Sequence, residues 1–392
     1  MRILVAHNYY RQSGGEDTVF KLEKSLLRHY GHEVIEHIES NQQVRNMSNT
    51  SLILQTIWSE PTYKTIQQLI EKERPDIAHF HNTFPLISPS AYYACREAHI
   101  PVVQSLHNPR LLCPAASFYR DGHLCIDCLG KTPPWPALLH ACYHHSRTHT
   151  AVVASMLTIH RWLKTWKKMV GAYIVFTDFY RKIFIEGGFP SKKIYVKPHF
   201  VPRGADSATH THLPAYALFI GRLDPEKGIW TLLRAWSKLK IPLKIRGDGQ
   251  LESVVREFIQ RNEMQHVELI GHLSEGDLSK LIRGASFVVI PSEGYYETFG
   301  MVAIESYSQG IPVLASRIGV LTEIVIDGKT GLHFSPGDPL DLASKAEMLW
   351  NNSDEIRRMG KEAFKEYEQK YTPEHNYPIL MNIYSSLIEA RI

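Results

Sequence analysis

The chain of 392 residues lacks the long apolar segments of secreted and membrane-spanning proteins. Its opening stretch, MRILVAHNYY, has an apolar run of only four residues, which is typical of a first strand rather than of a secretory signal. The uncharged run 148–160 has 13 residues, whereas about 20 are needed to cross a bilayer. The 5 cysteines of such a chain are expected to be reduced rather than paired in stable disulfides. We therefore expect a cytoplasmic protein, either soluble or bound to the inner face of the membrane.

A strong charge of one sign and internal repeats are also missing. The 44 basic and 40 acidic residues give a net charge of only +4, which argues against a dedicated nucleic-acid binder. Hydrophobic residues make up 44% of the chain, enough for two ordinary cores, and charged residues at 21% do not indicate disorder. At about 100–200 residues per domain, the length predicts two domains.

Short β-branched runs alternate with helical patterns, which predicts βα units and parallel sheets in an α/β fold. The first series comprises RILVAH, HEVIEHI, DIAHF, PVVQSLH, AYIVFT and KIYVKP, and the second comprises YALFIGRLD, LKIRGD, HVELIGHL, ASFVVIPS, IPVLAS and GLHFS. The expected organisation is a first Rossmann-like domain at 1–202, a linker at 203–214, a second Rossmann-like domain at 215–375, and a helix at 376–392 that crosses back to the first domain or packs on the second. Ligands of such sheets bind outside the carboxyl ends of the strands, so two domains facing each other would form a central cleft.

The segment EGYYETFGMVAIESYSQGIPVLAS has two glutamates, one before and one inside an expected helix, at an unusual spacing for a protein interior. Glu297 precedes a helix expected to begin near residue 298 or 299 and to end at 310, and Glu305 lies about two turns inside it. The first turn of this helix would present backbone N–H groups to an anion; these are the groups of Phe299, Gly300 and Met301. Eight helical residues span roughly 12 Å, so one nucleoside diphosphate sugar could reach both carboxylates and the helix start. The alternative is a capping acid and an unrelated buried glutamate.

A second motif, FIGRLDPEKGIWTLLRAW, places two cations beside a strand–helix turn. Arg222 follows the strand and Lys227 stands at the start of the helix. Two such cations can neutralise the charge that builds on a diphosphate leaving group. The alternative is ordinary surface charge on a loop.

The chain resembles the retaining glycosyltransferases of family 4, which have the two-domain GT-B fold. The resemblance rests on GRLDPEKG, GDGQLE, LIGHLS, PSEGYYETFGMVAIES and GIPVLASRIGVLTEIVIDGKTGLHF, which follow the family order across nearly all of residues 217–335. The first half matches more loosely, through SGGED, DIAHFHN, QSLHN and VFTDFYRKIFIEGGFPSKKIYVKPHF. The resemblance implies an acceptor-side first domain and a second domain that binds the nucleotide-sugar donor.

The resemblance also implies roles for single residues, beginning with the second domain. Arg222 and Lys227 would hold the donor diphosphate, Glu305 the ribose hydroxyls and Glu297 the hydroxyls of the donor sugar. The backbone around two further residues would lie near the nucleoside; these are Gly249 and Leu273.

In the first domain, the resemblance places Gly14 and Gly15 of SGGED near the diphosphate and His107 beside the reacting carbon of the sugar. A Gly-Gly pair alone is usually a turn, and the third glycine of a dinucleotide fingerprint is missing. His107 could instead be a histidine satisfied by backbone groups at a strand end. The family often has asparagine where this chain has His199, which leaves that residue without an assigned role.

These roles imply transfer of a hexose from a UDP- or GDP-sugar to an acceptor hydroxyl with retention of configuration, in cell-surface polysaccharide or glycolipid synthesis. The sequence contains no Asp-x-Asp pair, the usual signature of a divalent metal on a donor diphosphate. No catalytic metal is therefore expected. The alternatives are a nucleotide-sugar epimerase of the same fold and a binding protein that has lost catalysis; a zinc-bearing nucleic-acid module is disfavoured by the small net charge.

Four of the five cysteines have the spacing C-x11-C-x2-C-x13-C within a cysteine-rich insertion at about 113–142. A C-x2-C pair flanked by two more cysteines suits tetrahedral zinc, and the loop-forming segment between them would gain from such a site. We predict a structural zinc on Cys113, Cys125, Cys128 and Cys142. Four ordinary reduced cysteines are the alternative.

The segment MLTIHRWLKTWKKMVGAY predicts a helix with one apolar stripe and a basic surface. The stripe comprises Met156, Ile159, Leu163, Trp166 and Val170, and the cations are Arg161, Lys164, Lys167 and Lys168. Tryptophan beside lysine suits an anionic membrane surface and would bring the enzyme to a lipid-linked acceptor. A helix with a core-facing stripe and a solvated basic side is the other interpretation.

Overall fold

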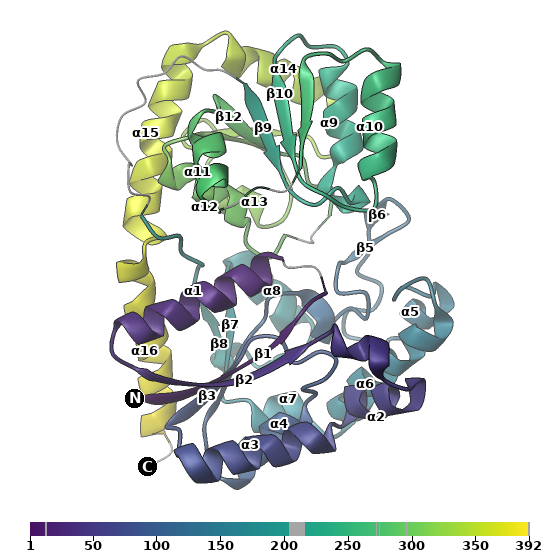
Figure 1. Cartoon of the computed structure of the whole chain (residues 1–392), viewed down its shortest axis with the longest axis vertical. Helices are drawn as coiled ribbons and strands as arrows, with labels where there is room; N and C mark the ends of the chain where they lie inside the picture. Colours follow the sequence, from purple (N-terminus) through teal and green to yellow (C-terminus); the bar gives the residue numbers. More distant parts are fainter. Residues whose placement is uncertain (12–13, 204–215, 272, 274, 295–296, 391–392) are drawn as a thin grey trace. The chain divides into compact units, whose positions relative to one another are not determined.

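The computed structural model of the chain describes residues 1–390 apart from 12–13, 204–215, 272, 274 and 295–296 (Figure 1). The expected linker at 203–214 lies, except for its first residue, outside the described residues. The chain divides into two compact units: one comprises Met1–Phe118, Cys125–Pro198 and Asn376–Ile392, and the other comprises Tyr119–Leu124 and His199–His375.

The first unit is built on a six-stranded parallel sheet of order β2-β1-β3-β4-β7-β8. Its strands are β1 (Arg2–Tyr9), β2 (Glu33–Ser40), β3 (Ile77–Phe80), β4 (Val102–Ser105), β7 (Ala172–Val175) and β8 (Ile194–Val196). The inner strands read as continuous apolar runs because helices cover both faces of a parallel sheet. All four residues of β3, β4 and β7 are buried.

Helices α1 and α8 lie on one side of this sheet, and α3, α4 and α7 lie on the other (Figure 1). The helices of the unit are α1 (Gly15–His29), α2 (Asn49–Ile57), α3 (Glu60–Glu73), α4 (Ser90–Glu97), α5 (Trp135–Leu139), α6 (Arg147–Trp162), α7 (Thr165–Met169), α8 (Asp178–Glu186) and α16 (Pro373–Glu389). Short 3-10 turns occur at η1 (Gln43–Asn46), η2 (Pro109–Leu111) and η3 (Ser191–Lys193). Side-chain caps start several of these helices: Ser48, Ser59, Ser146 and Thr177 each accept a backbone N–H of the first turn.

The second unit has its own six-stranded parallel sheet, of order β11-β10-β9-β12-β13-β14. The strands are β9 (Ala217–Ile220), β10 (Leu243–Arg246), β11 (Val267–Ile270), β12 (Phe287–Ile290), β13 (Val313–Ser316) and β14 (Gly331–Phe334). The first strand of the series lies between the second and the fourth, so the strand order reverses beside it. In open parallel sheets this switch point is where ligands bind.

Helices α9 and α10 lie on one side of the second sheet, and α11 and α12 lie on the other (Figure 1). The helices are α9 (Ile229–Trp236), α10 (Glu252–Arg261), α11 (Glu275–Arg283), α12 (Met301–Ser308), α13 (Leu321–Ile324), α14 (Pro339–Trp350) and α15 (Ser353–Lys370), with a 3-10 turn η4 (Pro225–Lys227). One buried cluster from β9, β10, β12 and α9 forms much of the core, and Trp236 within it is fully buried.

A two-stranded antiparallel hairpin comes from the cysteine-rich insertion. Its strands are β5 (Tyr119–Arg120) and β6 (His123–Leu124). Although the insertion belongs to the first half of the sequence, this hairpin groups with the second unit. The two parallel sheets confirm the predicted α/β fold of two Rossmann-like domains.

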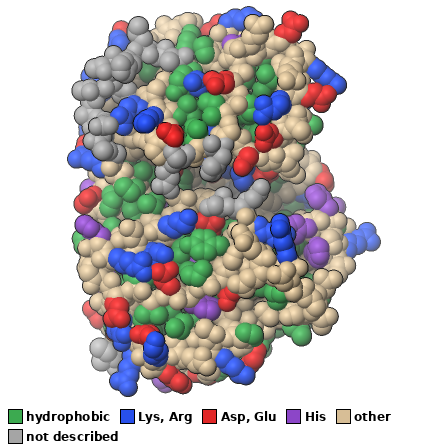
Figure 2. Space-filling view, in the orientation of Figure 1, with side chains coloured by type: hydrophobic (Ala, Val, Ile, Leu, Met, Phe, Trp, Pro, Cys, Tyr) green, Lys and Arg blue, Asp and Glu red, His purple; other side chains and the backbone are tan. Residues whose placement is uncertain are grey.

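Within the described part of the chain, no helix combines the length and the hydropathy needed to span a membrane. On the face shown in Figure 2, acidic and basic side chains alternate over both units. This mixture agrees with the small net charge of +4.

Candidate active site

The predicted donor residues of the second unit follow neighbouring strands at one edge of its sheet. Arg222 and Lys227 follow β9, and Glu297 follows β12, which pairs directly with β9. Gly249 and Leu273 follow β10 and β11, the next strands along. Since all these strands are parallel, their carboxyl ends share one edge, and the residues gather at the switch point.

The loop after β9 carries the two predicted cations. Arg222 Nη1 lies 3.1 Å from Asp224 Oδ2, and its Nη2 lies 3.8 Å from Glu226 Oε1. The Arg222 side chain is 40% exposed, so most of this pairing is screened by water. Neighbouring acids thus orient a guanidinium that still reaches solvent.

The central contact of the site is an ion pair between the Lys227 ammonium and the Glu297 carboxylate. The two side chains are only 14% and 19% exposed, respectively. Ser292 Oγ donates to the same Glu297 oxygen at 3.4 Å. The residue expected to bind diphosphate and the residue expected to bind sugar therefore meet directly across the two loops.

Glu293 also holds these two loops together, a role that the sequence did not reveal. Its backbone N–H donates to the carbonyl of Glu226 at 2.9 Å, and its carboxylate accepts from Thr231 Oγ1 at 2.6 Å. Tyr119 of the hairpin lies beside it: burial, with Glu293 and Glu226, raises the pKa of this tyrosine. Glu293 stands inside the same quoted motif as Glu297, but its spacing alone does not distinguish a structural acid from a ligand-binding one.

Two glycines allow the loops of the site to pack closely. Gly228, at φ +71°, is so near the loop after β12 that a Cβ there would lie 1.8 Å from the carbonyl oxygen of Pro291. A Cβ on Gly249 would lie 2.7 Å from the backbone nitrogen of Leu223. Backbone contact thus fixes the loops that follow β9, β10 and β12 against one another.

Helix α12 begins later than the sequence predicted. It spans Met301–Ser308 with Gly300 as its N-cap at φ +90°, not 298–310. The left-handed backbone of Gly300 keeps Phe299 out of the helix, and the ring of Phe299 is buried with its centroid 4.9 Å from that of His199 and 5.8 Å from that of Tyr371. The first turn therefore presents the N–H groups of Met301 and Val302 rather than that of Phe299. Glu305 lies inside the helix and is half-buried, not fully enclosed.

In the first unit, the Gly-Gly pair lies at the start of α1. Gly14 is the N-cap, and the Asp17 carboxylate accepts its N–H at 3.3 Å. Burial of the Glu16 carboxyl and the nearby charge of Asp17 raise the pKa of Glu16 to about 8. Much of Glu16 is thus protonated near neutral pH, which removes a negative charge from a helix start expected to face an anion.

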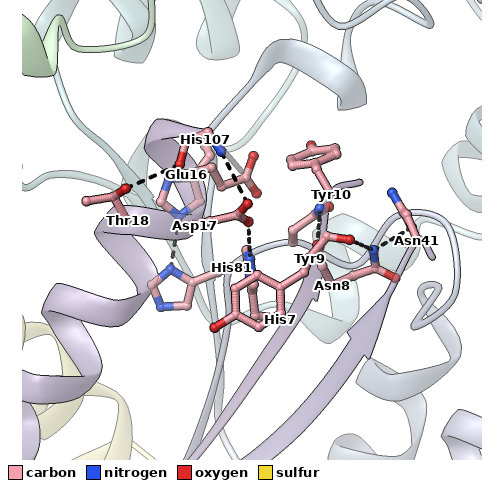
Figure 3. A network of polar contacts seen from close by, with 12 residues as sticks. His7, Asn8, Tyr9, Tyr10, Glu16, Asp17, Thr18, Asn41, His81 and His107 are labelled. Atoms are coloured by element: carbon pink, nitrogen blue, oxygen red, sulfur yellow. Dashed lines mark hydrogen bonds and ion pairs between the residues drawn. The ribbon is translucent and has the colours of Figure 1, made fainter. Parts of the chain in front are cut away.

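His107 lies just beyond β4 and is buried, with 8% of its surface exposed. Its Nε2 lies 2.9 Å from Nδ1 of His81, which follows the neighbouring strand β3, and Figure 3 shows the two rings facing one another. Both His79 and His81 are buried in this unit. The predicted catalytic histidine is therefore in direct contact with a second buried histidine.

The four predicted zinc ligands lie in one region of the first unit. Burial, and then the nearby thiols of Cys113, Cys142 and Cys125, raise the pKa of Cys128 to about 12. All of them are free thiols. Among the described residues, however, the group with three ligand atoms within 4.8 Å of one another is Glu23, His79 and His81, not a set of these cysteines.

The expected amphipathic helix is broken. Helix α6 ends at Trp162 and α7 begins at Thr165, with Lys164 between them in the left-handed region at φ +57°. The turn leaves Trp162 70% exposed and Leu163 53% exposed, whereas Trp166 is buried. Leu163 therefore does not join the apolar stripe, because the break turns it to solvent.

The second unit matches a known family. Residues 207–366 match the family Glycosyl transferases group 1. An uncharacterised glycosyltransferase of Methanocaldococcus jannaschii is 37% identical over 172 residues, which are 44% of this chain and 48% of that protein. O-antigen chain mannosyltransferase C of Escherichia coli is 29% identical over 177 residues, which are 45% of this chain and 48% of that protein. The chain thus spans about half the length of these curated relatives.

Solved structures show the same fold over the whole chain. HepE of Anabaena in complex with UDP has a TM-score of 0.70 at 16% identity, covering 99% of this chain and 100% of that one. Sucrose-phosphate synthase of Thermosynechococcus elongatus has a TM-score of 0.72 at 18% identity, covering 99% of each chain. At such identities the likeness shows the fold alone, and that fold is GT-B, as the sequence predicted.

Proposed function

We propose that the protein is a retaining glycosyltransferase that moves a hexose from a UDP- or GDP-sugar to an acceptor hydroxyl. The observation that carries this proposal is the meeting of Lys227 and Glu297 at the switch point of the second sheet. A diphosphate needs a cation and a sugar needs a hydroxyl-binding carboxylate, and both occur side by side there. The structure of HepE with UDP, which has the same fold, supports a nucleotide as ligand.

On this proposal the charge of the leaving diphosphate is neutralised by Arg222, Lys227 and the N–H groups at the start of α12. Glu305 binds the ribose hydroxyls, and Gly249 and Leu273 lie near the nucleoside. Glu297 orients the donor sugar and stabilises positive charge at the reacting carbon; it is not a nucleophile. These cations take the place of a catalytic metal in a chain without an Asp-x-Asp pair.

The acceptor hydroxyl attacks on the face from which the diphosphate leaves, and a leaving phosphate oxygen takes its proton. The bond from the anomeric carbon to the diphosphate oxygen breaks as the bond to the acceptor oxygen forms, so configuration is retained. Gly14 and Gly15 contribute to the diphosphate site, and His107 contacts the donor sugar. A cell-surface polysaccharide or glycolipid is the proposed product, in keeping with the O-antigen mannosyltransferase among the relatives.

Two other functions use the same donor site. A nucleotide-sugar epimerase would release free nucleotide without forming a glycoside, and a binding protein would hold the nucleotide sugar unchanged. Product analysis by mass spectrometry separates the three. Only a transferase gives a hexose-modified acceptor in proportion to the released nucleoside diphosphate.

Calorimetric binding of UDP, GDP and ADP tests the donor site first. We expect one of them to bind tightly to the wild type and at least about tenfold more weakly to Glu305→Ala, because a carboxylate that accepts two ribose hydroxyls contributes more than 1.4 kcal/mol. The unfolding temperature of the variant, compared with that of the wild type, separates a loss of binding from a loss of folding. If none of the nucleotides binds to the wild type, the proposed function fails.

We propose a structural zinc at Cys113, Cys125, Cys128 and Cys142, whose thiols gather around Cys128. Atomic absorption of purified protein should give about one zinc per chain, and Cys128→Ser should lose it while Cys95→Ser, at a buried cysteine of α4, keeps it. Well under one zinc per wild-type chain would mean four reduced cysteines without a metal.

We also propose that the turn between α6 and α7 contacts an anionic membrane and so brings the enzyme to a lipid-linked acceptor. Trp162 and Leu163 are exposed there, and Lys164, Lys167 and Lys168 are exposed beside them. Wild type should co-sediment with phosphatidylglycerol vesicles at low salt. The double variant Trp162→Ser, Leu163→Ser should bind several-fold less, whereas Leu340→Ser, an exposed leucine of α14, should not change. Equal sedimentation of all three proteins would contradict this contact.

A further inference from the structure

A group of cationic side chains at one edge of the first sheet plays no part in the proposed donor site. Arg11 follows β1 and Arg110 follows β4, and Phe84 follows β3, which lies between these two strands. Because the three strands are parallel, the loops after them meet at the same edge of the sheet. The strand order reverses beside β1, so this edge is the switch point at which ligands of a parallel sheet bind.

Aromatic rings hold the guanidinium of Arg110 in place. Its central carbon lies 4.3 Å from the centroid of the Phe84 ring and 5.0 Å from that of the Tyr143 ring. Nη1 donates to the carbonyl of Pro114 at 2.7 Å, whereas Nε and Nη2 make no hydrogen bond to a described residue. A planar guanidinium that is fixed and has N–H groups to spare suits a phosphate, which accepts two such bonds in parallel.

Histidines of the cysteine-rich insertion and of α6 continue from this arginine. The ring centroid of His144 lies 4.2 Å from that of Tyr143 and 6.1 Å from that of His149. His144 and His145 both have left-handed backbone, at φ +54° and +51°. Residues other than glycine seldom adopt this region, and such strain concentrates at ligand-binding sites. The chain thus bends sharply where it presents the exposed histidines.

These side chains act on one another through their charges. Burial lowers the pKa of His144, and so do four cationic neighbours, in the order His149, Arg110, Arg11 and His145. Within the described part of the chain, neither Arg11 nor Arg110 forms an ion pair with a carboxylate. The cations therefore repel one another without compensation, and an anion bound among them would turn this repulsion into attraction.

The acid beside Arg110 does not neutralise the group. Glu16 is close enough to Arg110 for their charges to interact, and its Oε2 accepts from Asn108 Nδ2 at 3.2 Å. Burial, and then Asp17, raise the pKa of Glu16 to about 8 although Arg110 opposes this. Much of Glu16 is thus uncharged near neutral pH, so the group of cations keeps its positive charge.

This group is separate from the turn for which we proposed membrane contact. Helix α6 runs from Arg147 to Trp162. Its 16 residues span about 24 Å. His149 lies in its first turn, whereas the exposed Trp162 is its last residue. The two features therefore stand at opposite ends of one helix and can be tested independently.

We propose that Arg11, Arg110, His144 and His149 form a binding site for a phosphate group of the acceptor. Only the word acceptor rests on the proposed function, because the binding of the anion does not require it. The phosphate could belong to a soluble sugar phosphate or to a lipid-linked acceptor, and the same cations would recognise either.

Calorimetry with two phosphate monoesters tests this site. The probes are glucose 1-phosphate and dihexanoyl phosphatidic acid below its micelle concentration, and each is titrated with and without a saturating nucleoside diphosphate in the donor site. We expect at least one probe to bind with a millimolar or tighter Kd that the nucleotide does not change. Tighter binding of the first probe would indicate a soluble acceptor, and tighter binding of the second a lipid-linked one.

Arg110→Met keeps an apolar stem between the two aromatic rings but removes the charge, so it should bind the probe at least about tenfold more weakly. Arg96→Met, at an exposed arginine of α4, is the matched control and should bind as the wild type does. Should Arg110→Met fail to fold, the double variant His144→Gln, His149→Gln changes two exposed side chains and should weaken binding several-fold.

NMR of protein labelled with nitrogen-15 histidine locates the bound anion. The pKa of His144, whose signal the His144→Gln spectrum identifies, should rise when the probe binds, because a negative charge stabilises the imidazolium. The site would be refuted by three results: no binding of either probe, equal binding by Arg110→Met and Arg96→Met, or displacement of the probe by the nucleoside diphosphate. A wild type that binds the probe but no nucleotide would refute the proposed function alone.

Discussion

Replacement of Glu297 by glutamine is expected to lower kcat about a thousandfold while the nucleoside diphosphate binds at least as tightly as to the wild type. A thousandfold loss corresponds to about 4 kcal/mol of transition-state stabilisation. The proposed reaction develops positive charge on the sugar ring, and a carboxylate at 19% exposure interacts with it far more strongly than a neutral amide does. Because this charge exists only in the transition state, the loss should fall on kcat rather than on KM.

Nucleotide binding should not weaken, because Glu297 holds Lys227 in an ion pair. Glutamine frees that ammonium, which can then meet the diphosphate without first leaving a carboxylate. Calorimetry with the nucleoside diphosphate and steady-state kinetics with the nucleotide sugar separate the two effects.

Glu293→Gln is the matched control for this experiment. It stands in the same loop, but its carboxylate accepts from Thr231 Oγ1 at 2.6 Å, a hydrogen bond that links the loop to α9. We expect its kcat to fall only a few-fold, together with a small loss of stability. If the kcat of Glu297→Gln also falls only a few-fold, the Glu297 carboxylate has no electrostatic role in the reaction and the assignment is wrong.

The grouping of the candidate residues of the second unit could be predicted from the sequence because each of them follows a strand of a parallel sheet. Arg222 and Glu297 each follow a short apolar strand, and parallel strands end at the same edge of a sheet. The order of the strands, with β9 beside β12, then brings the two loops together. The start of α12 was predicted two to three residues too early because Gly300 takes a left-handed φ of +90°, which interrupts the helical backbone before Met301.

Other features depend on pairings that no local pattern encodes. The hairpin 119–124 groups with the second unit although its flanking cysteines belong to the first. The approach of Glu23 to His81 joins residues of a helix and a strand end that are far apart in the chain. The apolar period around Lys164 predicts one continuous helix. The helix instead breaks at Lys164, because a left-handed residue there lets Trp166 become buried.

Among single methyl groups added to the second unit, the one introduced by Gly228→Ala is expected to be the most disruptive. At φ +71°, an L-residue costs roughly 1–2 kcal/mol by backbone strain alone. The new Cβ would also lie 1.8 Å from the carbonyl oxygen of Pro291, a backbone atom that cannot rotate away. The loops after β9 and β12 must then separate, which pulls Lys227 away from Glu297.

Gly328→Ala separates the two causes, because Gly328 has the same φ of +71° but no atom within 4 Å of the added Cβ. The free energy of unfolding, from urea titration followed by circular dichroism, should fall by about 1 kcal/mol in Gly328→Ala and by at least about 3 kcal/mol in Gly228→Ala. Only Gly228→Ala should also weaken nucleotide binding, by at least about tenfold, since its strain acts on the loops that would hold the diphosphate. Equal losses of stability in the two variants would mean that the loops after β9 and β12 can move apart to admit the methyl group. The close packing of these loops would then not be what holds Lys227 and Glu297 together.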